Sequence, residues 1–131
     1  MFTKIEPHLY LGDESDLKFI YSFRTNKPYL YVDARPFFNI LHADPNAEEL
    51  MVEPLRALSA ALAMLVSNYV DVYIYCQAGI ERSPFLTALV LFQLGRGTIE
   101  ECYHQVVIKR PETLVYQAWV DAYSFHVRKE G

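Results

Sequence analysis

The chain has 131 residues, a length that fits one domain, so we expect residues 1–131 to form a single domain. Hydrophobic residues make up 52%, enough for one continuous core. The formal net charge of −4 argues against a broad nucleic-acid-binding surface, and no polybasic run suggests contact with a membrane. The two cysteines make a poor disulfide framework and the first residues lack the apolar core of a signal peptide, so we expect a cytoplasmic protein.

The first half of the chain predicts short strands followed by one long helix. Residues 5–12 end in a Gly-Asp turn and predict one or two short strands at a sheet edge. A short helix is expected at 16–23, and the aromatic and β-branched run at 29–32 predicts a buried strand. Residues 35–46 contain two prolines and two asparagines and predict a long loop, which is often functional in a compact domain. Leucines at three- and four-residue spacing predict a helix over 55–69.

The second half predicts one more strand and three helices. Residues 70–75 predict a second buried strand, and the next helix begins at Pro84 and ends at Gly95. Thr98 with Glu101 predicts a capping box for the following helix. That helix stops before the proline at position 111. The last helix is expected to bury one face, made of Val115, Ala118, Trp119, Ala122 and Phe125. This order of elements predicts an α/β fold with a central, mostly parallel, twisted sheet flanked by helices.

The segment that carries chemistry is residues 72–84, which read VYIYCQAGIERSP. Cys76 comes at the carboxyl end of the predicted strand, where open α/β sheets place their sites. Arg82 follows six positions later at the start of a helix. Backbone N–H groups of such a loop and of the first helical turn converge on one point, where they bind an anion and favour a thiolate.

Three further residues of this loop suit the same chemistry. The guanidinium of Arg82 pairs two phosphate oxygens at once. Gly79 allows a tight turn without a side chain in the place of the phosphate. Ser83 is positioned to donate a hydrogen bond to Cys76 and to stabilise it as a leaving group.

Three motifs together resemble one enzyme family. CQAGIERS matches the Cys-x5-Arg-Ser/Thr signature of the protein tyrosine phosphatase superfamily. IEPHLYLGD resembles the opening strands of its dual-specificity branch, and LGRGTIEECYHQVVIKRP resembles the helix and Arg-Pro segment of that branch. The resemblance implies a compact dual-specificity-phosphatase-like fold and a phosphatase that hydrolyses phosphotyrosine, and also phosphoserine or phosphothreonine, through a phosphocysteine intermediate. It further implies a phosphorylated protein or peptide as substrate, no metal and no cofactor. We expect a monomer.

The resemblance also implies a role for each site residue. Cys76 is the nucleophile, Arg82 binds the phosphate, and Ser83 supports the leaving thiolate. Family members carry an Asp roughly thirty residues before the Cys as general acid, which points to Asp44, 32 residues before Cys76. Asp33 is the competing carboxylate, expected instead to orient a loop or to pair with Arg35. The substrate-binding loop comprises Gln77, Ala78, Gly79, Ile80, Glu81 and Arg82.

Some positions depart from the family pattern. Tyr75 precedes the nucleophile where the family usually has a His, and because it carries no positive charge it predicts a slower enzyme. The family's Asn falls near Tyr116, and Gln117 is the nearest amide, a candidate for positioning water that is equally explained as a solvated helix residue. Glu81 would repel a multiply phosphorylated lipid head group, which favours a phosphoprotein substrate. Cys102 is expected to be an ordinary buried cysteine.

Two alternatives remain open. Tyr-Cys-Gln and Val-Asp-Ala-Arg echo the strands of rhodanese-type enzymes, which include sulfurtransferases and arsenate reductases. Tyr75 also suits a pseudophosphatase, which would bind phosphorylated partners without hydrolysing them.

Overall fold

A four-stranded mixed sheet forms one side of the protein in the computed structural model, which describes residues 1–18, 27–38 and 50–130. The strands are β1 (Thr3–Glu6), β2 (Leu9–Asp13), β3 (Tyr29–Asp33) and β4 (Asp71–Cys76). Their order is β1-β2-β4-β3, with β1 antiparallel to β2 and the other two pairs parallel. The predicted mostly parallel sheet is therefore confirmed, and β4 lies in its interior.

The side chains of strand β4 alternate between the two faces of the sheet. Val72, Ile74 and Cys76 are buried on the helix side, whereas Tyr73 and Tyr75 are half-buried on the opposite face. The prediction of a buried strand at 70–75 is confirmed. The same prediction for 29–32 was wrong about burial, because β3 is an edge strand whose first two residues are exposed.

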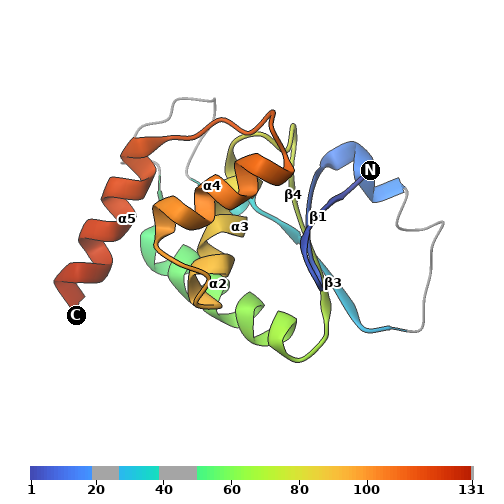
Figure 1. Ribbon diagram of the computed structural model, residues 1–131, viewed down its shortest axis with the longest axis horizontal. Coiled ribbons are helices and arrows are strands. Elements are labelled where there is room, and N and C mark those ends of the chain that lie inside the picture. The colour runs from blue at the N-terminus through green and yellow to red at the C-terminus, as the bar shows by residue number, and fades with distance from the viewer. Residues whose placement is uncertain (19–26, 39–49, 131) are drawn as a thin grey trace.

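Four α-helices of the described residues lie on the same side of the sheet (Figure 1). They are α2 (Val52–Ser67), α3 (Arg82–Gln93), α4 (Ile99–Lys109) and α5 (Gln117–Glu130). Two short 3-10 helices, η1 (Glu14–Asp16) and η2 (Arg35–Phe37), follow β2 and β3. Helix α3 lies at the centre of the core, and its Phe85, Leu86 and Leu89 are fully buried. It contacts β2 and β4 on one side and α2 and α4 on the other. No helix in the described part of the chain is long and apolar enough to span a membrane.

The predicted helix ends agree closely with the structure. Helix α3 begins at Arg82, two residues before Pro84, and Gly95 beyond its end has a left-handed φ of 78°. Thr98 and Glu101 form the expected capping box, with reciprocal hydrogen bonds of 3.1 and 3.0 Å. The start of α3 at Arg82 is where the loop that follows β4 passes into a helix.

The buried face of α5 differs from the prediction. Trp119 belongs to it as expected, but Val120 and Tyr123 are its other fully buried members, and Phe125 is 68% exposed. The helix begins at Gln117, so the expected position at Val115 precedes it and does not share its periodicity. Two other predictions fall largely outside the described residues: the helix at 16–23, described only to residue 18, and the loop at 35–46, which opens with η2.

Candidate active site

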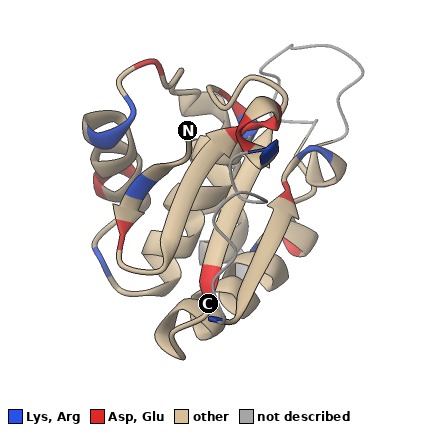
Figure 2. Ribbon diagram, turned by 90° about the vertical axis from the view of Figure 1, so that its right-hand side faces the viewer, with Lys and Arg blue, Asp and Glu red and all other residues tan. Residues whose placement is uncertain are grey.

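The parallel strands β2, β3 and β4 have their carboxyl ends on the same side of the sheet, and the predicted loop begins there (Figure 2). Asp13 ends β2, Asp33 ends β3 and Cys76 ends β4, and the middle of each of these strands is free of charged residues. Parallel pairing places Asp13 opposite Cys76, and Asp33 opposite Tyr75. The nucleophile candidate therefore lies between two carboxylates at the topological position typical of α/β sites.

The sulfur of Cys76 lies within a ring of hydrogen-bond donors. The backbone N–H groups of Gly79 and Ser83 point at Sγ from 3.3 and 3.4 Å, and the Ser83 hydroxyl lies 3.1 Å from it. Cys76 is 1% exposed, and Ser83 is fully buried. Donors directed at one atom stabilise a negative charge there, which is what a thiolate or a bound phosphate requires.

The carbonyl groups of the loop are held away from this centre. Three of them accept hydrogen bonds from groups outside the loop. The pairs are Glu14 N to Gln77 O (3.4 Å), Arg110 Nε to Gly79 O (2.9 Å) and Leu114 N to Ile80 O (2.8 Å). This arrangement removes carbonyl dipoles that would repel an anion.

Gly79 is required at its position for two reasons. Its φ of 68° is a conformation that residues with side chains rarely adopt. A Cβ there would lie 2.7 Å from both the carbonyl oxygen of Gly12 and Nη2 of Arg110. The backbone of the loop therefore packs directly on β2 with no space for a side chain.

Arg82 occupies the first turn of α3. Its Nε is buried and has no hydrogen-bond partner among the described residues. An unpaired buried guanidinium N–H is costly unless a ligand accepts from it. The segment thus contains an unpaired donor in addition to the N–H groups directed at Cys76, and together they suit a phosphate.

Asp33 does not have the properties of a general acid. It accepts a bidentate pair of hydrogen bonds from Arg35, with Nε and Nη2 at 2.9 and 2.7 Å. Partial burial alone would raise its pKa, but the hydrogen bonds from Arg35 and the charges of Arg35 and Arg82 lower the pKa of Asp33 on balance. The expected pairing with Arg35 is confirmed. Asp44, the preferred acid, lies outside the described residues.

Glu81 and Gln117 are both engaged with neighbours. Partial burial, followed by the hydrogen bond and charge of Glu81, raises the pKa of Tyr116 to about 12. The Gln117 amide donates to Asp121 one helical turn further on, at 2.9 Å. Gln117 is therefore bonded along its own helix, as expected for a solvated helix residue.

Tyr75 lies on the sheet face opposite Cys76, as the alternation of β4 requires. Its backbone carbonyl accepts a hydrogen bond from Ala34 at 2.8 Å. The Tyr75 side chain also contributes to the electrostatic environment of Arg35. The family's His at this position would occupy the same face.

Arg110, Asp13 and Thr3 have no role that the sequence predicts. Arg110 comes just after α4 and extends its guanidinium to Gly79 O and to the Thr3 hydroxyl, 2.9 Å away in each case. The Arg-Pro pair at 110–111 was part of the family resemblance, and that resemblance was the one signal in the sequence that pointed to Arg110. Its contacts with β1 and β2 depend on the fold alone.

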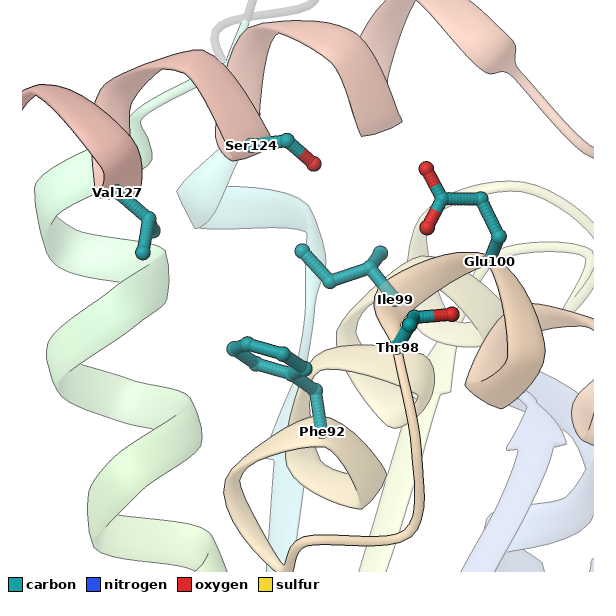
Figure 3. Close-up of a pocket in the computed structure, with 6 residues that line it drawn as sticks. All are labelled: Phe92, Thr98, Ile99, Glu100, Ser124 and Val127. Atoms are coloured by element: carbon teal, nitrogen blue, oxygen red, sulfur yellow. The ribbon is translucent and has the colours of Figure 1, made fainter.

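A separate cavity of about 400 Å³ lies between α5, the end of α3 and the start of α4 (Figure 3). Phe92, Ile99 and Val127 give it apolar walls, and Thr98, Glu100 and Ser124 add its polar atoms. None of these six residues is cationic or belongs to the loop between β4 and α3. The cavity therefore lacks the positive charge that a phosphate site needs.

Comparisons with known proteins give structural relatives only. No family model matches the sequence, and no curated protein is similar to it in sequence. Solved structures of phosphatases and of one phosphatase-like protein are similar over nearly the whole chain. Human DUSP28 has a TM-score of 0.74 at 13% identity, covering 98% of this chain and 99% of its own.

Two further structures have comparable scores. The human tyrosine phosphatase-like serine/threonine/tyrosine-interacting protein has a TM-score of 0.70 at 12% identity, covering 98% of this chain and 97% of its own. Cydia pomonella PTP-2 phosphatase has a TM-score of 0.68 at 17% identity, covering 95% and 88%. At such identities the likeness concerns the fold. The resemblance seen in the sequence is confirmed at this level: the chain has the fold of the dual-specificity branch of the protein tyrosine phosphatase superfamily.

Proposed function

We propose that the protein is a cysteine-dependent phosphoprotein phosphatase that acts on phosphotyrosine, and also on phosphoserine or phosphothreonine. The main support is the geometry around Cys76. Two backbone N–H groups and the Ser83 hydroxyl surround its sulfur, and the buried Nε of Arg82 beside them has no partner among the described residues. A phosphoryl group would supply the acceptor that Arg82 Nε lacks, and the groups around Cys76 could donate to its other oxygens.

The proposed first step is an in-line displacement at phosphorus. The Cys76 thiolate forms the S–P bond while the P–O bond to the substrate residue breaks. Asp44 gives its proton to the departing oxygen, so the product leaves as a neutral hydroxyl. Arg82 and the loop N–H groups stabilise the charge on the equatorial oxygens.

The second step reverses these roles. Asp44, now a carboxylate, takes a proton from a water molecule. The oxygen of that water attacks phosphorus, and the S–P bond breaks. Ser83 stabilises the departing thiolate through its hydroxyl. Phosphate leaves, and the thiolate and the protonated Asp44 are restored. The lowered pKa of Asp33 supports this division of labour, because an aspartate that holds Arg35 so firmly is a poor proton donor.

A phosphate-binding module without hydrolysis is the second candidate. Tyr75 favours it, because the position before the nucleophile has no positive charge. A structural relative described as a tyrosine phosphatase-like interacting protein is consistent with such a role on this fold. The rhodanese-type alternative has no support from the fold, since the structural similarity is to phosphatases.

The test is hydrolysis of p-nitrophenyl phosphate from pH 5 to 8 by wild type, Cys76→Ser and Asp44→Asn under reducing conditions. We expect turnover by wild type and none by Cys76→Ser, although that variant should still bind a phosphotyrosine peptide. Binding of the peptide by wild type without phosphate release would favour the binding module. Absence of both would contradict the proposal.

A further inference from the structure

Arg110 is a buried cation on the outer side of the catalytic loop. The residue is only 6% exposed. Its guanidinium donates from Nε to Gly79 O and from Nη1 to the Thr3 hydroxyl, at 2.9 Å each. Asp13 and Glu112 lie 3.8 and 3.4 Å from it as ion-pair partners.

These contacts bear on the orientation of one residue of the loop. The N–H of Gly79 points at Cys76 Sγ from 3.3 Å, while its carbonyl points to Arg110. The left-handed φ of Gly79 produces this arrangement, in which the donor faces the sulfur and the acceptor faces outward. Glycine is the residue most free to leave such a conformation, so an external contact is needed to hold it.

The other two outward carbonyls are held differently. Gln77 O and Ile80 O accept from backbone N–H groups, which any residue would supply. Gly79 O accepts from a side chain. The middle of the loop therefore depends on the identity of residue 110, whereas its two flanks do not.

Stability alone is a poor explanation for a buried cation here. Burying a charge carries a desolvation penalty that its ion pairs often fail to offset, and an apolar residue of similar volume would serve a core equally well. A guanidinium, in contrast, joins three elements through separate N–H groups: the loop through Gly79, β1 through Thr3 and β2 through Asp13. Such a link fixes the loop relative to the sheet.

We propose that Arg110 is a positioning residue of the phosphate loop: by holding the Gly79 carbonyl outward it fixes Gly79 in the left-handed conformation in which the N–H of this residue faces Cys76 and the bound phosphoryl group. This inference rests on the proposed function for its catalytic consequence. Its consequence for anion binding is independent of turnover. Arg110 touches neither substrate nor sulfur in this role and acts through Gly79.

The experiment compares Arg110→Met and Arg110→Lys with wild type. Arg96→Met is the matched control, because Arg96 also ties β1 to the helical layer, through a bidentate pair with Glu6 at 3.0 Å, and its side chain donates to Glu6 and Leu94 rather than to the loop. Tungstate affinity is measured by titration calorimetry, and kcat and KM with p-nitrophenyl phosphate. All measurements are made well below the melting temperature of each variant.

We expect Arg110→Met to weaken tungstate binding and to lower kcat/KM by roughly tenfold or more, as for loss of a charge-assisted hydrogen bond. Arg110→Lys should recover part of both losses, since its ammonium still reaches one acceptor. Arg96→Met should keep wild-type values even where its melting temperature falls equally. If Arg110→Met does not fold, Thr3→Val tests the same link, and a smaller loss in the same direction is expected.

The outcomes separate the two proposals. Wild-type tungstate affinity and kcat/KM in folded Arg110→Met would overturn the role of Arg110 and leave the phosphatase proposal standing. Equal losses in Arg110→Met and Arg96→Met would also overturn it, because the effect would then be general destabilisation. A wild type that binds tungstate but releases no phosphate would count against the phosphatase proposal, while the affinities of the variants would still decide the role of Arg110.

Discussion

The hydroxyl oxygen of Ser83 lies 3.1 Å from the sulfur of Cys76, on a fully buried side chain in the first turn of α3. The same hydroxyl also lies 3.4 Å from the carbonyl oxygen of Gly12, a second acceptor for its hydrogen bond. The N–H of Ser83 points at the sulfur as well. The hydroxyl is therefore placed to stabilise a thiolate, which matters most when the thiolate is the leaving group.

The Ser83→Ala variant should slow hydrolysis of the phosphocysteine more than its formation. Loss of a hydrogen bond to a charged group corresponds to about 1.5–3 kcal/mol, roughly ten- to a hundredfold in kcat. Stopped-flow measurement should then show a burst of p-nitrophenol that wild type lacks. Ser59→Ala is the control, since Ser59 is a buried serine of α2 that bonds to Arg56 O at 3.0 Å. A Ser83→Ala enzyme without a burst and with wild-type kcat would contradict the assignment.

Gly79→Ala should be inactive and less stable than Gly95→Ala. Both glycines have left-handed φ values, 68° and 78°, so each substitution costs roughly 1–2 kcal/mol in backbone strain. Only at Gly79 would the new Cβ also meet Gly12 and Arg110, at 2.7 Å, whereas nothing lies within 4 Å at Gly95. Thermal unfolding and p-nitrophenyl phosphate turnover measure the two effects. Equal stability and activity of the two variants would show that close packing at Gly79 is unimportant.

Asp44→Asn and Asp33→Asn should affect different properties. Asp44→Asn should remove the fall in kcat toward alkaline pH that deprotonation of a general acid produces, with a natural phosphopeptide as substrate. Asp33→Asn should keep that part of the profile, because the lowered pKa of Asp33 leaves it ionised throughout the range. Loss of the alkaline fall in Asp33→Asn instead would transfer the acid role to Asp33.

Asp33→Asn should instead lower stability. Since the pKa of Asp33 is lower in the folded than in the unfolded chain, its carboxylate contributes stability above the unfolded value of about 3.9. That contribution is lost as the pH falls through the folded pKa. The variant should be about 1 kcal/mol less stable at pH 7, and the difference should shrink below pH 4. Denaturant unfolding at several pH values measures it, and a constant difference would refute the linkage.

Tyr75→His should raise kcat/KM several-fold at pH 6, with a smaller gain at pH 8. A protonated imidazole would add positive charge to the residue that precedes the nucleophile in the chain. An unperturbed His loses that charge near pH 6.5. Tyr75→Phe is the control, since it changes the side chain without adding charge. An increase in Tyr75→Phe equal to that in Tyr75→His would mean that the tyrosine hydroxyl, and not the missing charge, limits the rate.

Cys102 should resist alkylation under conditions that modify Cys76. Both cysteines are buried, so their charge environments distinguish them. Burial and the nearby charges of Glu101 and Glu6 raise the pKa of Cys102 to about 11, whereas two backbone N–H groups point at the sulfur of Cys76. At pH 7 the thiolate fraction of Cys102 is then about one in ten thousand. Mass spectrometry after iodoacetamide should find one adduct, on Cys76, which tungstate suppresses. Modification of Cys102 in the folded protein would contradict this.

The sequence determined the local elements of the site. Alternating side chains in VYIYC define a strand that buries Cys76, the CQAGIERS motif predicts an anion-binding loop, and Thr98 with Glu101 starts α4 as predicted. Each of these signals acts over a few residues, because strand alternation, tight turns and helix capping are set by neighbouring side chains. The pairing of Asp33 with Arg35 is equally local and was also expected.

The groups that complete the loop come from distant parts of the sequence, and the packing of the fold brings them together. Thr3 and Arg110 are 107 positions apart and meet across the sheet edge, where Arg110 also holds Gly79. The exposure of Tyr29 and of Phe125 likewise depends on strand order and helix start, which no local pattern encodes. Sequence periodicity specifies which face of an element is apolar. The neighbours that cover that face, and the cation that orients the loop, follow from how the elements pack together.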